Sequence, residues 1–180
     1  TLSTVSPEGE PWVVPLLFAR DGDRILVHGS TGAGALRAAA SGAPVALCVF
    51  AFDALVVGHT TFESTANYRS AVLRGRLVAL PDAEKDAALN VLSDKLIPGR
   101  VAEVRASSAK ELAATQVLAL PIESGGWLYK SRDAHADDPD EPTDAWGGIV
   151  PVVTDWGEPL AAPWTTADLP ASVRRLVENH

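Results

Sequence analysis

The stretch His28–Arg37 reads HGSTGAGALR and places three glycines and two hydroxyl residues between a strand-like segment and a helix-like segment. Arg24–His28 favours a strand, whereas Ala35–Ala40 consists of strong helix formers and stops before Gly42. Glycines in such a turn can adopt positive φ and point backbone N–H groups into one concavity, beside the positive end of the helix dipole. The stretch predicts an anion cradle that fits a phosphate, and a plain strand-to-helix turn is the alternative. It is neither a Walker A loop nor a Gly-x-Gly-x-x-Gly motif.

Composition sets the class of protein. The chain has 180 residues, 47% of them hydrophobic and 21% charged, which is ordinary for one globular domain covering residues 1–180. A net charge of -8 without a basic stripe argues against nucleic-acid binding. The longest apolar run, residues 43–59, is broken by Pro44 and Asp53, so no membrane span is expected. A single cysteine fits a cytoplasmic protein. Because the chain lacks methionine and opens in a strand-like segment at Thr1, we expect natural sequence before it.

Strand-like segments dominate the chain, and helices only connect them. A hairpin joins residues 1–5 to residues 11–20, with an interruption at Pro15. The near-continuous apolar run at 45–58 predicts a long strand covered on both faces. Other strands are expected at 67–80, 115–123, 127–131 and 146–153, and helices at 82–97, 108–114 and 170–178. Asp82 is expected to be an N-cap. This order predicts a mainly β protein, a barrel with a few covering helices.

Two polar segments bear on function. In 67–80, one face carries Tyr68, Ser70, Arg74 and Arg76, which is either a cationic binding face or a solvated outer face. The acidic segment 133–144 lacks the spacing of a metal site and is expected to be a solvated loop.

The order of several motifs carries a resemblance. The segment NYRSAVLRG at 67–75 lies downstream of HGSTG, and PGR at 98–100, KELAAT at 110–115 and WGGIVP at 146–151 follow. In this order the chain resembles the FMN-binding split-barrel family related to pyridoxamine 5'-phosphate oxidase, in the branch of flavin-nucleotide-binding and nitroimidazole-resistance proteins. The resemblance covers nearly the whole chain. It implies a six-stranded antiparallel split β-barrel with covering helices, and a homodimer with FMN in clefts at the subunit interface.

The resemblance also implies which residues bind the cofactor. The strand at residues 13–17 would lie along the isoalloxazine edge, and residues 28–32 would approach the ribityl phosphate. The strand that carries Tyr68, Arg69, Ser70 and Arg74 would contact phosphate or flavin. Trp146 would close over the flavin from the other subunit, or else belong to the core. The full set is Val14, Pro15, Leu16, His28, Gly29, Ser30, Thr31, Gly32, Arg37, Tyr68, Arg69, Ser70, Arg74 and Trp146.

Departures from the oxidase narrow the function. Its basic pair after the phosphate loop is replaced by Ala33 and Gly34, for which Arg37 would have to compensate, and its C-terminal Arg-x-His motif is missing. Oxidation of pyridoxamine phosphate is therefore not expected. A hydrolase is not expected either, because the Gly-x-Ser-x-Gly elbow is absent.

Three functions remain open. The first is an FMN-dependent oxidoreductase that passes electrons from a nicotinamide or similar donor to a small organic acceptor. The second is a flavin-binding carrier, store or redox sensor without turnover. The third is a split barrel that uses another cofactor, such as haem or a deazaflavin. No catalytic residue is assigned, although His28 and His59 are candidate proton donors or plain hydrogen-bonding residues.

Overall fold

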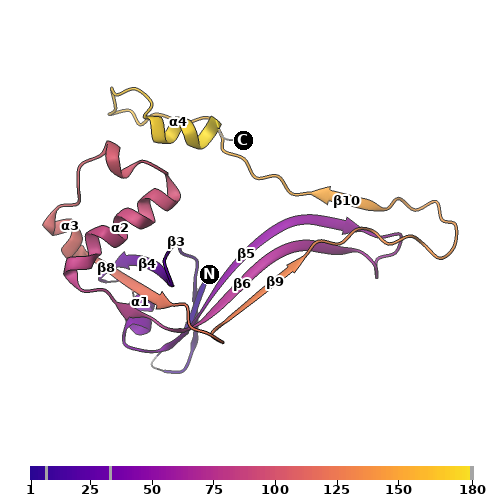
Figure 1. Cartoon of the computed structure of the whole chain (residues 1–180), viewed down its shortest axis with the longest axis horizontal. Helices are drawn as coiled ribbons and strands as arrows, with labels where there is room; N and C mark the ends of the chain where they lie inside the picture. Colours follow the sequence, from indigo (N-terminus) through magenta and orange to yellow (C-terminus); the bar gives the residue numbers. More distant parts are fainter. Residues whose placement is uncertain (7, 33, 179–180) are drawn as a thin grey trace.

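The protein contains two antiparallel sheets (Figure 1). The computed structural model describes residues 1–6, 8–32 and 34–178. The larger sheet has the order β2-β1-β5-β6-β9, with β10 paired to β5, and the smaller has the order β3-β4-β8-β7. The strands are β1 (Leu2–Val5), β2 (Pro11–Val14), β3 (Phe18–Asp21), β4 (Arg24–Ser30), β5 (Pro44–Val57), β6 (Thr65–Arg76), β7 (Val78–Ala79), β8 (Thr115–Pro121), β9 (Trp127–Arg132) and β10 (Gly148–Pro151).

The helices are α1 (Gly34–Ala40), α2 (Asp82–Leu96), the 3-10 helix η1 (Val101–Glu103), α3 (Ala109–Ala114) and α4 (Ala171–Glu178). The expected class, a mainly β antiparallel split barrel with covering helices, is confirmed. It is built from sheets of six and four strands rather than from six strands in all. The expected interruption at Pro15 separates β2 from β3, and the expected strand 67–80 ends at Arg76, after which β7 joins the other sheet.

The barrel half contains the hydrophobic core. Leu2, Val27, Leu47 and Leu118 belong to a buried cluster between the two sheets. On the other face of β4, Leu26 belongs to a second cluster, with Ala88 and Leu92 of α2. The inner strands β4 and β8 contribute side chains from one face to the first cluster and from the other face to the second, which explains their continuous apolar sequences.

The ribbon half, defined as residues 49–57 of β5 and 65–71 of β6 with β9 and β10, extends away from the barrel (Figure 1). β5 has 14 residues and is therefore roughly 46 Å long at 3.3 Å per residue. The prediction that both faces of this strand are covered is wrong here, because Phe50 is 61% exposed and Leu55 is 47% exposed. β1 pairs with β5 at residues 45–47, which belong to the barrel end of that strand.

A β-bulge at Asp53 divides the ribbon. The register with β6 shifts between Phe52 and Ala54. Beyond this point Ala54 and Val56 are buried while Leu55 remains exposed. The side chain of Asn67 exchanges two hydrogen bonds with the backbone of Ala134, at 2.9 and 2.8 Å, and so fixes the segment after β9 against β6.

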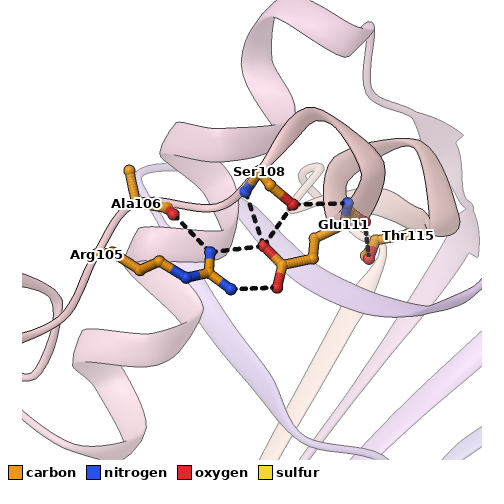
Figure 2. Close-up of polar contacts among 5 residues, drawn as sticks. All are labelled: Arg105, Ala106, Ser108, Glu111 and Thr115. Carbon is orange, nitrogen blue, oxygen red and sulfur yellow. Dashed lines mark hydrogen bonds and ion pairs between the residues drawn. The ribbon is translucent and has the colours of Figure 1, made fainter.

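The helix ends follow local chemistry. The prediction that Asp82 is an N-cap is wrong: extended Pro81 is the N-cap, and the Asp82 carboxylate pairs with Lys85 Nζ at 2.7 Å. The predicted capping box of α3 is confirmed, because Ser108 Oγ accepts from the Glu111 N–H and Glu111 Oε2 accepts from the Ser108 N–H (Figure 2). Arg105 joins this network and, with Ser108, holds the pKa of Glu111 far below its usual range.

The C-terminal part returns to the barrel half. Residues 152–170, here called the arm, run from β10 to α4 without a helix or strand (Figure 1). The Val152 N–H donates to the Asp53 carbonyl at 2.9 Å at one end of the arm. At the other end the Ser172 N–H and Oγ donate to Glu103 at 2.8 and 2.5 Å. The arm is therefore fixed at both ends, while Val153, Leu160 and Trp164 are exposed.

Candidate functional site

The first three residues of the glycine-rich stretch belong to β4, and Thr31 and Gly32 form a turn after it. His28, Gly29 and Ser30 pair with Val117, Gln116 and Thr115 of β8. The Thr31 N–H donates to the Ala114 carbonyl at 3.1 Å. Neither Gly29 nor Gly32 has positive φ, so a nest of N–H groups built on those glycines is a wrong prediction. Ala33, also in the stretch, lies outside the described residues.

A different role explains Gly34, the first residue of α1. A Cβ at this position would lie 2.8 Å from Cη2 of Trp12, so only glycine lets the indole of β2 approach the helix this closely. Gly34 therefore permits the start of α1 to pack against the Trp12 indole.

Next to this stretch is a small cavity of 220 Å³ that we call the cation pocket. Two residues expected at the phosphate, Thr31 and Arg37, line it together with Lys85 and Gln116. The Gln116 Oε1 atom is buried without a hydrogen-bond partner. Turning this amide would present its NH2 group to the cavity instead. Two cations, a hydroxyl and an amide are suitable donors for a phosphate dianion.

Lys85 and Gln116 were not expected from the sequence. Lys85 comes from the first turn of α2 and Gln116 from the start of β8, and neither belongs to a motif of the resemblance. Only the packing of α2 and β8 around the end of β4 brings them to Thr31. The register between β4 and β8 places Gln116 opposite Gly29, so a known register would have brought Gln116 into the candidate site.

The candidate residues of β6 are divided between two faces. Tyr68, Ser70 and Arg74 alternate onto one face, and the Tyr68 ring lies 5.9 Å from that of Phe50. Arg69 points to the opposite face and pairs with Asp53, with Nη2 to Oδ1 at 2.8 Å. This hydrogen-bonded guanidinium holds the pKa of Asp53 below its usual range. The structure therefore does not bring Arg69 to the other three.

Arg74 belongs to a separate hollow at the barrel end of β6. This hollow, of 790 Å³, is also lined by Arg76 and by residues of β1 and the start of β5. Tyr68 and Arg74 are separated by roughly 20 Å along the strand, at 3.3 Å per residue. One phosphate cannot contact both.

The first and last candidates lie at opposite ends of the molecule. Val14 and Leu16 pack on the core cluster between the sheets, on either side of Pro15. Trp146 is 64% exposed and stacks against Gly148 at the far end of the ribbon, so the alternative that it is a core residue is wrong. β10, which begins two residues after Trp146, lies far from α1 and α2, the helices that contribute Arg37 and Lys85 to the cation pocket (Figure 1).

The histidines considered as proton donors also differ in setting. His28 is exposed on β4, whereas His59 lies in the turn after β5, with Nδ1 2.6 Å from Glu63 Oε2. The described residues contain no group of three or more His, Cys, Asp or Glu side chains that could hold a metal ion. In the part of the chain that the structure describes, no helix is both long and apolar enough to cross a bilayer.

Comparison with known proteins identifies the family. Residues 1–125 match the family model described as pyridoxamine 5'-phosphate oxidase. The FAD and heme binding protein from Mycobacterium smegmatis is 44% identical, with a TM-score of 0.93 over 98% of this chain and 88% of that chain. The flavocytochrome Anf3 from Azotobacter vinelandii is 28% identical, with a TM-score of 0.86 over 97% of this chain and 83% of that chain.

A more distant structure agrees in fold alone. The putative 5-nitroimidazole antibiotic resistance protein from Bacteroides thetaiotaomicron is 21% identical, with a TM-score of 0.55 over 67% of this chain and 69% of that chain. No curated protein sequence matches the chain. The family match over residues 1–125 and the 44% identity to a relative of the same fold lead to one conclusion: the chain belongs to the pyridoxamine 5'-phosphate oxidase family of split-barrel proteins.

Proposed function

We propose that this protein is a flavin-binding redox protein. The observation that carries the proposal is the 44% identity, over 98% of this chain, to a protein named for binding FAD and heme. The flavocytochrome at 28% identity supports it, because its name also joins a flavin to a haem protein. A bound flavin would supply electron transfer, and the chain would hold it, orient it and limit the access of water.

The cation pocket would hold the flavin phosphate. Arg37 and Lys85 provide positive charge, and Thr31 and Gln116 provide neutral donors. Charge-assisted hydrogen bonds are about twice as strong as neutral ones, so these two cations would account for most of the phosphate affinity. FMN, the flavin expected from the sequence, and FAD share this phosphate, and the relative named for FAD makes both candidates.

A homodimer would complete the flavin site. Phe50, Phe52 and Leu55 are exposed on the ribbon, and aromatic and aliphatic side chains gathered in this way are typical of a face that another surface covers. Trp146 lies too far from the cation pocket to serve the same chain's flavin, so Trp146 of the partner subunit would close over it. The isoalloxazine would then lie between the partner and residues 14–16, where the chain passes from β2 toward β3.

The electron donor we propose is a nicotinamide or similar reductant, and the acceptor is a small organic molecule. Haem is proposed as a second prosthetic group on the strength of the two relatives. The chain has no methionine, one cysteine and four histidines, so histidine is the obvious axial ligand type available to it.

The test is the visible spectrum of the purified protein before and after loading with FMN, FAD and haemin. We expect retained flavin bands, bleaching of those bands by NADH or NADPH, and a Soret band from haemin. Chromatography of the extracted flavin distinguishes FMN from FAD. Retained flavin that no reductant bleaches would favour a carrier or store, and a protein that holds neither cofactor would refute the proposal.

A further inference from the structure

The turn between β5 and β6, residues 58–64, holds an imidazole against a carboxylate. His59 Nδ1 lies 2.6 Å from Glu63 Oε2. The turn is fixed by its own hydrogen bonds: the Gly58 N–H donates to Ser64 Oγ at 3.1 Å, and Ser64 Oγ donates to the Thr60 carbonyl at 2.9 Å. A Cβ on Gly58 would lie 2.6 Å from the Glu63 Cβ, so the carboxylate is held in place by close packing on the backbone.

This pairing leaves one nitrogen of the imidazole for another partner. Nδ1 and Glu63 Oε2 are both buried and neither has a hydrogen-bond partner in the present geometry, whereas the side chain of His59 as a whole is 22% exposed. The exposed part of the ring is therefore the edge away from Nδ1, where Nε2 lies. A small rotation of either side chain would turn this 2.6 Å contact into a hydrogen bond from Nδ1–H to the carboxylate. That bond would fix the tautomer that has its lone pair on Nε2 and raise the basicity of that atom, as metal-ligating histidines require.

The surroundings limit the kind of metal. Because the described residues provide no cluster of three or more ligating side chains, an ion at Nε2 would receive at most one further such ligand from them. A metal with so few protein ligands must bring most of its ligands with it, as the iron of a porphyrin does.

The surface next to the turn suits a large apolar ring. A hollow of 420 Å³ adjoins residues 58–64 and is lined by Leu55, Val56, Val57 and Ala66, with Ser64 and Thr65. Phe62, within the turn, is 96% exposed. Cofactor sites commonly combine such a concave aliphatic surface with one or two placed polar groups.

We propose that His59 is an axial ligand of haem iron through Nε2, and that Glu63 is the positioning residue that fixes its imidazole. The inference rests on the proposed function, in which the chain binds haem as well as flavin. The other described histidines, His28 and His135, are exposed, and neither has a side-chain hydrogen-bond or ion-pair partner among the described residues.

The experiment is titration of the full chain, loaded with its flavin, with haemin. The variants are His59→Ala, Glu63→Gln and, as the matched control, His135→Ala on the segment next to the same end of the ribbon. We expect His59→Ala to lose the six-coordinate or five-coordinate histidine Soret band and to regain it with added imidazole. His135→Ala should keep the spectrum of the unmodified protein.

Glu63→Gln tests the positioning role separately. We expect haemin to bind about 10-fold more weakly, the usual effect of losing such a partner. The iron should also show a more positive reduction potential and a lower iron–histidine stretching frequency, and Glu63→Asp should restore both. A merely structural role of Glu63 would move neither, so unchanged values would overturn this part of the proposal.

Two further readings separate the possible failures. Flavin absorbance and far-UV circular dichroism report folding, and His59→Tyr, which should introduce a tyrosinate charge-transfer band, replaces His59→Ala if the latter unfolds. An unchanged haem spectrum in folded, flavin-loaded His59 variants would overturn the ligand assignment and leave the flavin function standing. If the unmodified chain binds neither flavin nor haemin, the proposed function fails and the ligand assignment fails with it.

Discussion

The barrel half and the ribbon half share two long strands, β5 and β6, yet the apolar side chains of these strands are buried in one half and exposed in the other. In the barrel half, Leu47 of β5 and Leu73 of β6 are buried between the sheets. Further along the same strands, Phe50 and Phe52 are exposed to 61% and 40%. The barrel half thus encloses its own core, whereas the ribbon half presents apolar side chains outward. This difference is the physical basis for proposing a second copy as the ribbon's cover.

The largest expected effect concerns the barrel half alone. Leu118 of β8 is fully buried. Replacing it by alanine should lower the free energy of unfolding by about 2 to 5 kcal/mol, because a cavity remains. Leu55→Ala in the ribbon should instead destabilise only at protein concentrations that support the dimer. Urea unfolding at several concentrations measures both. Equal, concentration-independent losses would contradict the division into two halves.

The ribbon half can be tested through assembly. Replacing both Phe50 and Phe52 by aspartate should raise the dimer dissociation constant by about 100-fold or more, since burial of each ring is worth roughly 1.5 to 3 kcal/mol. Sedimentation velocity across a dilution series gives the constant, and circular dichroism checks that the barrel half stays folded. A double variant that still sediments as the unmodified protein does would remove the ribbon from the interface.

Flavin affinity compares the cation pocket with the hollow around Arg74. Arg37→Ala and Lys85→Ala should each weaken FMN binding by about 10- to 100-fold, because a hydrogen bond to a charged group is worth roughly 1.5 to 3 kcal/mol. Arg74→Ala should have a smaller effect, since Arg74 lines a different hollow. Quenching of flavin fluorescence measures all three. The reverse order would move the phosphate to Arg74.

The smallest effect concerns the junction of the arm with the barrel half. Hydrogen bonds from the Ser172 side chain and backbone, with help from Arg100, hold the pKa of Glu103 below its ordinary value of 4.5. A carboxylate with a lowered pKa in the folded state stabilises at pH values above the ordinary one and loses that contribution as the pH falls through the lowered pKa. α4 should therefore stay docked at pH 5 and exchange faster in more acidic solution.

Amide hydrogen exchange of α4 between pH 3 and pH 6, corrected for intrinsic rates, measures this release. Glu103→Gln should weaken docking throughout and remove the acid dependence. A variant whose α4 still responds to acid as the unmodified chain does would assign the response to another group.

Patterns whose cause is local were predicted well from the sequence. The capping box of α3 depends only on Ser108 and Glu111, and the end of β2 depends on Pro15. The continuous apolar residues of the inner strands β4 and β8 indicate buried strands. The resemblance supplied the split barrel and the family.

Features that depend on long-range packing were not predictable in this way. Lys85 and Gln116 meet Thr31 only after α2 and β8 are placed. The apolar residues of β5 were expected in a core, because hydrophobicity alone does not say whether the covering surface belongs to the same chain. Arg69 was grouped with its neighbours in sequence, although strand alternation sends it to Asp53.

The bulge at Asp53 shifts the alternation of inward and outward side chains along β5 by one residue. Phe50 and Phe52 follow a two-residue period, and the extra residue delays the next outward side chain to Leu55 while it turns Ala54 and Val56 inward. Deleting Asp53 would leave Leu55 outward, because Ala54 would then follow Phe52 in the register it already has, but Arg69 would lose its carboxylate. If Asp53 instead took a regular place in the ladder, Ala54 and Val56 would face outward and Leu55 inward. The single extra residue therefore decides which side chains the end of the ribbon presents to its neighbour.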